Sequence, residues 1–315
     1  MAAAGLTDLR VGRFRLVKQL GRGSTGVVFL ATRVGAAGRE VALKVVDSDL
    51  ASQPGFGERL ENEIHRISVL SHPSILPVYE YGTAGELTYL VMPVASGGSL
   101  KGRLEAGPLP ARDAWQIFRP VADALLSAHK AGVVHGDVKP GNILFDAYGR
   151  VLLADFGLAR IHMGFARGTP GYMAPEQARG EPSDPRADLY SLAVVLFEML
   201  AGSPPYRYAA DADLLRATAA APVPSARERC PEVPVGLDAA LYRALAKDPA
   251  HRYQTMLELV WALRPVLDPR PRSGRYWRSP SWSELDKATF VPSVLRGNRA
   301  GKDGSAGLKQ FEPGA

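Results

Sequence analysis

The sequence predicts an α+β protein in which a strand-rich part precedes a helix-rich part. Before residue 93, short stretches of alternating or continuous apolar residues are typical of strands, and one stretch among them has helical spacing. After residue 99, the longest apolar-periodic stretches have helical spacing. Between residues 143 and 154, two short apolar runs flank a polar turn, which indicates a hairpin of buried strands. Strands followed by helices are typical of this fold class.

Composition excludes several classes of protein. A hydrophobic fraction of 46% in 315 residues can fill a sizeable core. No apolar run reaches the roughly 18 residues of a membrane helix, so we expect no membrane span. The single cysteine, Cys230, excludes an intrachain disulfide and fits the reducing cytoplasm. Much of the net charge of +6 comes from arginines between residues 264 and 278, so we expect no nucleic-acid partner.

The first strands surround a glycine-rich turn. Residues 14–20 alternate apolar and polar side chains, and residues 27–31 form a second apolar run. Between them lies the sequence Gly-Arg-Gly-Ser-Thr-Gly (21–26). Its glycines would let the backbone approach the phosphates of a ligand, whereas the simpler alternative is a flexible hairpin tip.

The next strand and the next helix each carry an inward-facing charge. Lys44 lies in the strand predicted for residues 41–46, among small or apolar neighbours, so it requires an anionic partner. In the helix predicted for residues 56–70, Glu63 falls on the apolar stripe and Glu61 falls off it. Helical phase therefore favours Glu63 as the partner of Lys44.

Polar groups gather at the two ends of the central hairpin. His135, Asp137, Lys139 and Asn142 precede the hairpin, and Asp155 follows it. Because a hairpin brings its ends together, we expect these groups to meet at one mouth. Phosphoryl transfer needs metal ligands, a group that orients the attacking hydroxyl, and positive charge near the moving phosphoryl group. Two carboxylates, an ammonium and an amide suit that chemistry.

Together the motifs resemble those of a known family. The sequence HGDVKPGN (135–142) resembles the catalytic loop of eukaryotic-type (Hanks-type) protein kinases, and DFG (155–157) resembles their metal-binding motif. The resemblance covers roughly residues 14–265, in a style similar to that of bacterial serine/threonine protein kinases. It implies a bilobal protein-kinase-like fold, with an antiparallel β N-lobe that contains one helix and a mainly α C-lobe.

The resemblance also divides the chain. Residues 1–13 would be an N-terminal extension, residues 14–268 the kinase domain, and residues 269–315 a mostly disordered tail rich in proline and arginine. Within the domain, we expect the N-lobe at about 14–92, the hinge at 93–98 and the C-lobe at 99–268. The basic tail contains four aromatic residues, Tyr276, Trp277, Trp282 and Phe290. They could dock on the kinase body, bind a partner or have no role, and these alternatives stay open.

Roles for individual residues follow from the resemblance. Asp137 would orient the substrate hydroxyl, and Lys139 would neutralise the γ-phosphate. Lys44, paired with Glu63, would hold the α- and β-phosphates. Mg²⁺ would be held by Asn142 and Asp155. ATP would lie in a cleft under the glycine-rich turn, and the residues expected around it are Gly21, Gly23, Ser24, Gly26, Val28, Ala42, Lys44, Met92, Pro93, Ala95, Asn142 and Asp155.

Further positions match structural contacts of the family. Thr169 is expected to bond the aspartate and the lysine of the catalytic loop. Asp188 is expected to cap the backbone of that loop, and Glu176 is expected to form a buried ion pair with Arg252. His135 is expected to pack behind the loop.

Gly136 is a departure from the family pattern. Most members have an arginine here, which grips a phosphorylated activation loop. The stretch 158–168 contains no Ser, Thr or Tyr, so it offers no phosphorylation site. We therefore predict a kinase of the non-RD type, whose activity does not depend on phosphorylation of this loop.

Two other functions compete with a serine/threonine protein kinase that transfers the γ-phosphoryl group of ATP to a protein. A small-molecule phosphotransferase of the aminoglycoside- or choline-kinase type shares the His-Gly-Asp loop, but such enzymes generally lack Lys139, the block 169–176 and Arg252. A nucleotide-binding scaffold (pseudokinase) is disfavoured because the candidate catalytic and metal-binding residues are all present.

Overall fold

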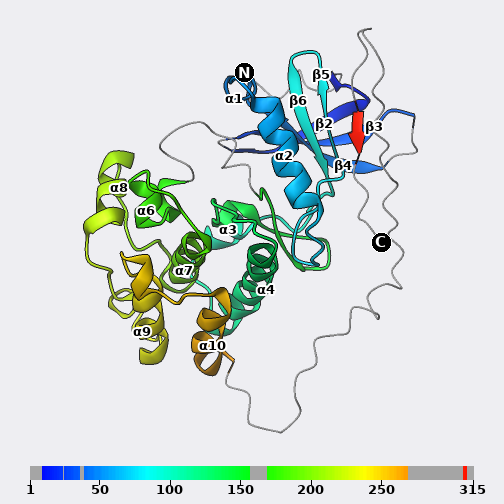
Figure 1. Cartoon of the computed structure of the whole chain (residues 1–315). Helices are drawn as coiled ribbons and strands as arrows, with labels where there is room; N and C mark the ends of the chain where they lie inside the picture. Colours follow the sequence, from blue (N-terminus) through cyan, green and yellow to red (C-terminus); the bar gives the residue numbers. More distant parts are fainter. Residues whose placement is uncertain (1–8, 24, 36–38, 157–168, 269–307, 311–315) are drawn as a thin grey trace.

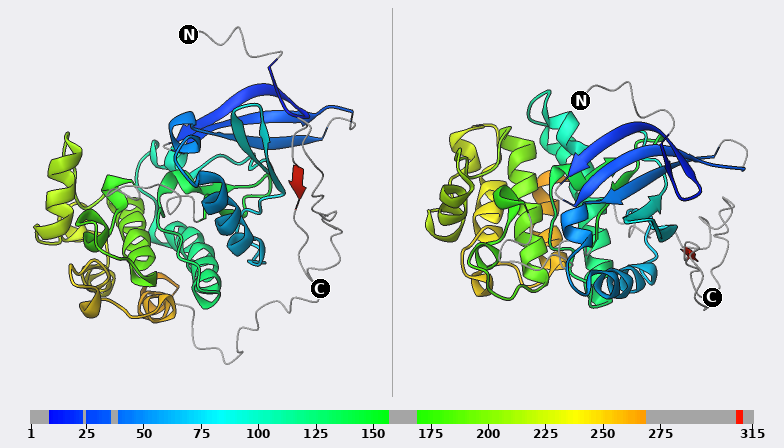
Figure 2. Two further views of the ribbon diagram at one scale, coloured as in Figure 1. Left: turned by 45° about the horizontal axis from the view of Figure 1, so that its top comes forward. Right: turned by 90° about the horizontal axis from the view of Figure 1, so that it is seen from above.

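The protein consists of a sheet-containing lobe and a larger helical lobe (Figure 1). The computed structural model describes residues 9–23, 25–35, 39–156, 169–268 and 308–310. The left view of Figure 2 shows the sheet and the helical part as separate lobes. The predicted fold, with an antiparallel β N-lobe and a mainly α C-lobe, is confirmed.

The N-lobe is built on one antiparallel sheet with the strand order β1-β2-β3-β4-β6-β5-β9. Apolar residues on one side of the sheet form a cluster that includes Leu43 and Val91. A second cluster joins Val46 and Leu90 of the sheet to Leu60 and Ile64 of α2, and a third contains Ala42 and Met92. The elements are β1 (Arg10–Val11), β2 (Phe14–Gly23), β3 (Gly26–Arg33), β4 (Glu40–Val46), α1 (Ser48–Ala51), α2 (Phe56–Ser68), β5 (Glu80–Ala84), β6 (Leu87–Met92) and β9 (Leu308–Gln310).

Several elements were not foreseen from the sequence, and two of the shortest are α1 and β9. Helix α1 is a single turn before α2, started by the Asp47 side chain, which accepts a hydrogen bond from the Asp49 backbone. Strand β9 pairs antiparallel with β5, with Leu308 opposite Gly82. Elements of three or four residues are too short to show a hydrophobic period. The rest of the predicted tail, residues 269–307 and 311–315, lies outside the described residues.

The C-lobe is organised around α7, which is buried on nearly all sides. Helix α4 packs against α7 and α10. The described helical elements of the C-lobe, with 3₁₀ helices written η, are α3 (Leu100–Leu104), α4 (Ala111–Lys130), η2 (Pro140–Asn142), η3 (Pro170–Tyr172), α6 (Pro175–Ala178), α7 (Pro185–Ala201), α8 (Asp211–Ala220), η4 (Ala226–Glu228), α9 (Val235–Ala244), η5 (Pro249–His251) and α10 (Met256–Leu267). In the described part of the chain, no helix combines the length and the apolar character that a membrane crossing requires.

The predicted hairpin is present and lies against the chain segment between the lobes. Strand β7 (Ile143–Phe145) pairs antiparallel with β8 (Val151–Leu153). Gly97 donates its backbone N–H to the Phe145 carbonyl at 2.8 Å, and Phe145 donates to the Gly98 carbonyl at 2.9 Å. A Cβ at Gly97 would lie 2.5 Å from the Asp146 carbonyl oxygen, so no side chain fits there without displacing the backbone.

Candidate active site

The hairpin brings the candidate metal-binding residues together. Asn142 ends η2 directly before β7, and Asp155 follows β8 by two residues. The Ala154 backbone donates to the Asn142 carbonyl at 2.8 Å, which closes the mouth of the hairpin. The predicted convergence of Asn142 and Asp155 is therefore observed.

The Asp137 carboxylate is held on both of its oxygens. One oxygen (Oδ2) contacts Lys139 Nζ at 2.6 Å and Asn142 Nδ2 at 3.2 Å. The other (Oδ1) accepts from the backbone N–H and the hydroxyl of Thr169, both at 3.0 Å. Lys139 also donates to the Thr169 hydroxyl at 2.7 Å. The predicted bonds of Thr169 to the aspartate and the lysine are present, and they leave the carboxylate a single orientation.

Lys44 reaches across from the N-lobe sheet to Asp155. The Lys44 Nζ lies 2.8 Å from Asp155 Oδ2, and Lys44 is only 2% exposed. Asp155 has a positive φ of 63°, a backbone conformation that costs free energy in a non-glycine residue. Burial is the largest single influence and raises the pKa of Asp155, but the charge and hydrogen bond of Lys44, together with other nearby groups, keep the net pKa below its ordinary value. The aspartate is therefore held as a carboxylate.

Glu63 is buried on the inward face of α2, whereas Glu58 and Glu61 are exposed. The helical phase read from the sequence was therefore right. The ion pair that the structure gives Lys44 is the one with Asp155. The proposed pairing of Lys44 with Glu63 stays a prediction.

The expected adenine-binding residues lie on the neighbouring strands β3, β4 and β6 and on the linker between the lobes that follows β6. Ala42 of β4 is opposite Met92 of β6, and both belong to an apolar cluster that also contains Ala154, with Val28 of β3 packed against it. An apolar cluster beside Asp155 is a suitable surface for a purine ring. Pro93 and Ala95 are half-buried in the linker that follows β6, and Ser24 lies outside the described residues.

The glycine-rich stretch forms a tighter hairpin than expected, with Gly21 and Gly23 in β2 and Gly26 in β3, and these three glycines differ in their surroundings. A Cβ at Gly26, where φ is +143°, would lie 2.0 Å from the Val45 carbonyl oxygen, so the fold itself requires glycine there. A Cβ at Gly21 or Gly23 would meet no described atom within 4 Å. The backbone at Gly21 and Gly23 is therefore open to a ligand.

The residues present fit a magnesium ion held together with a nucleotide. Mg²⁺ prefers oxygen ligands and usually binds one or two carboxylates plus substrate phosphates. Asp155 supplies a carboxylate, and the Asn142 amide nitrogen donates to the Asp137 carbonyl at 2.9 Å, which leaves the Asn142 amide oxygen as an acceptor. Within the described ranges there is no cluster of three or more His, Cys, Asp or Glu, and this type of site needs none.

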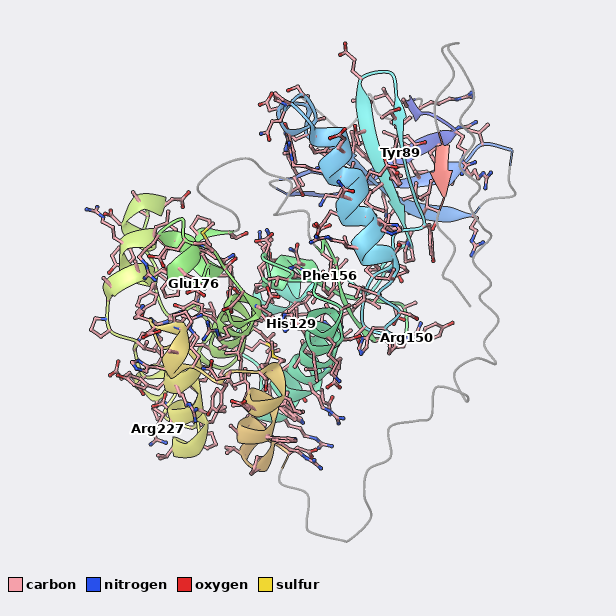
Figure 3. All side chains as sticks on the ribbon, viewed as in Figure 1. Tyr89, His129, Arg150, Phe156, Glu176 and Arg227 are labelled. Carbon is pink, nitrogen blue, oxygen red and sulfur yellow. The ribbon has the colours of Figure 1, made fainter. Side chains whose placement is uncertain are left out.

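The backbone of the catalytic loop is fixed by Asp188. Its carboxylate accepts the backbone N–H groups of His135 and Gly136 and a ring nitrogen of His129, each at 2.8 Å. Burial by itself raises the pKa of Asp188, but the hydrogen bond and charge of His129, together with the other groups around the carboxylate, lower it by more, so the net pKa lies below its ordinary value. The predicted capping role of Asp188 is confirmed. Figure 3 labels His129 and Phe156, which lie near the junction of the two lobes.

His135 packs behind the loop, as expected. It is fully buried, its ring centroid lies 4.6 Å from that of Phe156, and its Nε2 lies 2.9 Å from the Ala154 carbonyl oxygen. Its Nδ1 accepts the Asp137 backbone N–H at 3.2 Å. This bonding pattern places the ring proton on Nε2.

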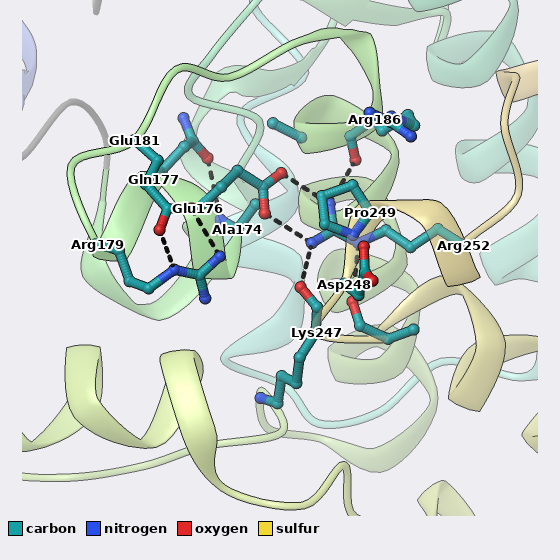
Figure 4. Close-up of polar contacts among 12 residues, drawn as sticks. Ala174, Glu176, Gln177, Arg179, Glu181, Arg186, Lys247, Asp248, Pro249 and Arg252 are labelled. Atoms are coloured by element: carbon teal, nitrogen blue, oxygen red, sulfur yellow. Dashed lines mark hydrogen bonds and ion pairs between the residues drawn. The ribbon is translucent and has the colours of Figure 1, made fainter.

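The predicted ion pair of Glu176 with Arg252 is also present (Figure 4). Two guanidinium nitrogens of Arg252 contact the two carboxylate oxygens of Glu176 at 2.7 and 2.8 Å, and Arg252 is fully buried. The pair fastens α6 to the loop that precedes α10. The next residue, Gln177, donates to the Gly136 carbonyl at 3.1 Å. Sequence reasoning missed this contact, because a glutamine in the first turn of a helix indicates only a helix cap.

Comparisons with known proteins define the family. Residues 14–260 match the family model described as "Protein kinase domain". The serine/threonine-protein kinase PrkC of Bacillus subtilis is 34% identical over 309 residues, which cover 96% of this chain and 47% of that protein. The serine/threonine-protein kinase PknB of Mycobacterium leprae is 38% identical, over 78% of this chain and 42% of that protein.

A solved structure agrees with the sequence matches. The crystal structure of the Mycobacterium tuberculosis PknI kinase domain superposes with a TM-score of 0.67 at 31% identity, over 84% of this chain and 99% of that chain. The chain belongs to the protein kinase domain family, in its bacterial serine/threonine branch. It spans about half the length of the curated relatives it matches or somewhat less. The family and fold predicted from the sequence are confirmed.

Proposed function

We propose that the protein is a serine/threonine protein kinase that transfers the γ-phosphoryl group of ATP to a Ser or Thr hydroxyl of a protein. The observation that carries this proposal is the Asp137 carboxylate, which Lys139, Asn142 and Thr169 hold at the mouth of the hairpin. A carboxylate held in this way can accept a hydrogen bond from an incoming hydroxyl and orient it.

The remaining residues complete the proposed reaction. Bound Mg²⁺, held by Asn142 and Asp155, would neutralise charge on the phosphate oxygens. Lys44 would turn from Asp155 toward the α- and β-phosphates, with Glu63 as its partner. Lys139 would balance charge on the γ-phosphate during transfer.

The adenine would lie against the apolar cluster described above. Val28, Ala42 and Met92 would contact the ring, and the backbone of Pro93 and Ala95 would bond its edge. Gly21, Gly23, Ser24 and Gly26 would cover the phosphates. Among the described residues, no atom lies within 4 Å of a Cβ built on Gly21 or Gly23, which supports this arrangement.

A protein acceptor is favoured over a small alcohol by the contacts of Thr169. Through this residue the segment 169–176 is bonded to Asp137 and Lys139, so a chain docked on the segment would lie beside the transfer site. A scaffold without transfer would have no use for these bonds to the catalytic aspartate. Relatives of this chain are named serine/threonine-protein kinases, which supports the same choice.

Transfer of labelled phosphate from ATP with Mg²⁺ tests the function. We expect phosphate on Ser or Thr of protein acceptors, lost in the Asp137→Asn variant. The matched control is Asp146→Asn in the β7–β8 turn, which keeps an oxygen for the backbone bonds of Tyr148 and Arg150. Transfer only to small alcohols would assign the protein to the phosphotransferases, and nucleotide binding without transfer would favour the scaffold.

Activity without loop phosphorylation is part of the proposal. The stretch 158–168 lies outside the described residues, and its sequence contains no Ser, Thr or Tyr. Treatment of the purified chain with a phosphatase should leave the rate unchanged. A lower rate after treatment would contradict this point.

The domain limits and the location complete the proposal. Residues 14–268 would form the kinase domain and residues 269–315 a basic, aromatic tail that binds a partner or the kinase body; the pairing of β9 with β5 supports a contact with the kinase body. The single cysteine supports a reducing compartment, and we propose the cytoplasm. The tail was expected to contribute charge but no nucleic-acid site, and we propose none.

A further inference from the structure

The peptide group between Gly136 and Asp137 is held at both of its polar atoms. Its carbonyl oxygen accepts a hydrogen bond from Gln177 Nε2 at 3.1 Å. Its N–H donates to His135 Nδ1 at 3.2 Å. Since this peptide carries the Cα of Asp137, the two bonds set the direction in which the catalytic carboxylate leaves the backbone.

The amide of Gln177 can donate to Gly136 in only one orientation. Its Oε1 accepts the Ala174 backbone N–H at 3.0 Å, so its nitrogen must be the atom that faces the Gly136 carbonyl. Gln177 is 7% exposed and belongs to α6, which the neighbouring Glu176 fastens to the buried Arg252. The donor is therefore held by a rigid support.

Gly136 is the position at which the chain departs from its family, and its backbone needs this support. Its φ of +79° lies in the left-handed region, which glycine adopts without strain but also leaves easily. Asp188 holds the N–H of Gly136 at 2.8 Å, while Gln177 holds its carbonyl. Without an arginine side chain here, these two bonds fix the residue that precedes the catalytic aspartate.

We propose that Gln177 is a positioning residue that holds the Gly136–Asp137 peptide and so aims the Asp137 carboxylate at the substrate hydroxyl. The inference rests on the proposed kinase function. It makes α6 a direct link between the substrate-docking segment 169–176 and the catalytic loop. This link needs no phosphorylated side chain.

The simpler alternative is that Gln177 only caps α6. Glutamine and glutamate at this position of a helix both accept the N-cap N–H, and a negative charge is favourable at a helix N-terminus. Gln177→Glu therefore keeps the bond from Ala174 and replaces the donor to Gly136 with an acceptor. Gln177→Met, which has a similar volume and no charge, removes both bonds.

Steady-state kinetics with a protein acceptor and the melting temperature of each variant test the proposal. We expect Gln177→Glu to melt below wild type, because its buried carboxylate oxygen would face the Gly136 carbonyl without a donor. Assayed below its melting temperature, it should keep its KM for ATP and lose about 10- to 100-fold in kcat, because small misplacements of catalytic groups are costly. Gln177→Met should lose kcat and also melt lower. The matched control is Gln254→Glu, since the Gln254 amide also donates to backbone carbonyls, away from the catalytic loop.

Each outcome has a distinct meaning. A kcat within twofold of wild type in either folded variant would overturn the positioning role. An equal loss of kcat in Gln254→Glu would overturn it as well, because the loss would then reflect general destabilisation. A wild-type chain without transfer would instead refute the proposed function.

Discussion

Removal of the Arg252 side chain should destabilise the kinase fold strongly. Arg252 makes a bidentate ion pair with Glu176. It also donates hydrogen bonds to the backbone carbonyls of Ala246, Arg186 and Lys247, at 2.8 to 3.2 Å. In Arg252→Met the Glu176 carboxylate, 5% exposed, loses the guanidinium charge that balances it. Breaking one partner out of a buried pair costs about 3–5 kcal/mol.

The expected change in melting temperature follows from this free energy. For a domain of about 250 residues, 1 kcal/mol corresponds to about 2–4 °C, so Arg252→Met should melt about 6–20 °C below wild type. Differential scanning calorimetry and urea unfolding would measure the change. Both should show it at neutral pH without any ligand.

The chain provides a matched control in the same region. Arg179 also makes a bidentate ion pair, with Glu181, at 2.7 and 2.8 Å (Figure 4). Both of these side chains are exposed. Arg179→Met should melt within about 2 °C of wild type, because exposed pairs are screened by water and salt. Equal melting temperatures for Arg252→Met and Arg179→Met would refute the argument that burial decides the cost.

Three further changes have defined outcomes. Gly26→Ala should lower the melting temperature by several degrees, since its Cβ would meet the Val45 carbonyl, whereas Gly21→Ala should melt like wild type in the same scan. The Asp188 pKa is lowered by folding, so the stability that Asp188 contributes is present above its unfolded pKa of about 3.9 and is lost as pH falls through the folded value. In urea titrations, the difference in free energy of unfolding between wild type and Asp188→Asn should therefore be constant above about pH 5 and shrink below about pH 4. A difference that stays constant at every pH would contradict a lowered pKa of Asp188 in the folded protein. Lys44→Met should lower kcat/KM for labelled-phosphate transfer at least about 100-fold, and a smaller loss would argue against its role at the phosphates.

Local patterns in the sequence predicted most of the fold and the main polar groups. Strand alternation and the period of 3.6 residues depend on side chains a few positions apart, so they survive in a single sequence. Helical phase separated Glu63 from Glu61 for this reason. The hairpin spacing likewise predicted that Asn142 and Asp155 would meet, because the two strands pair directly.

Contacts between distant segments were beyond such reasoning unless the family resemblance supplied them. The bond of Gln177 to the Gly136 carbonyl spans 41 positions and involves a backbone atom, which has no identity in the sequence. The pairing of Lys44 with Asp155 spans 111 positions and competes with the equally plausible Glu63. Choosing between two carboxylates for one lysine requires the relative position of the lobes.

The close packing of Gly97 against the hairpin turn limits how the lobes can move. Gly97 and Gly98 are bonded to Phe145 of β7, and at Gly97 there is no room for even a methyl group. Within this linker, bending is therefore confined to the four residues 93–96, immediately after β6. The backbone bonds of Leu153 to Ser74 and Leu76 tie a second segment of the chain to the same hairpin, so we expect any opening of the lobes to leave residues 74–76 with the C-lobe.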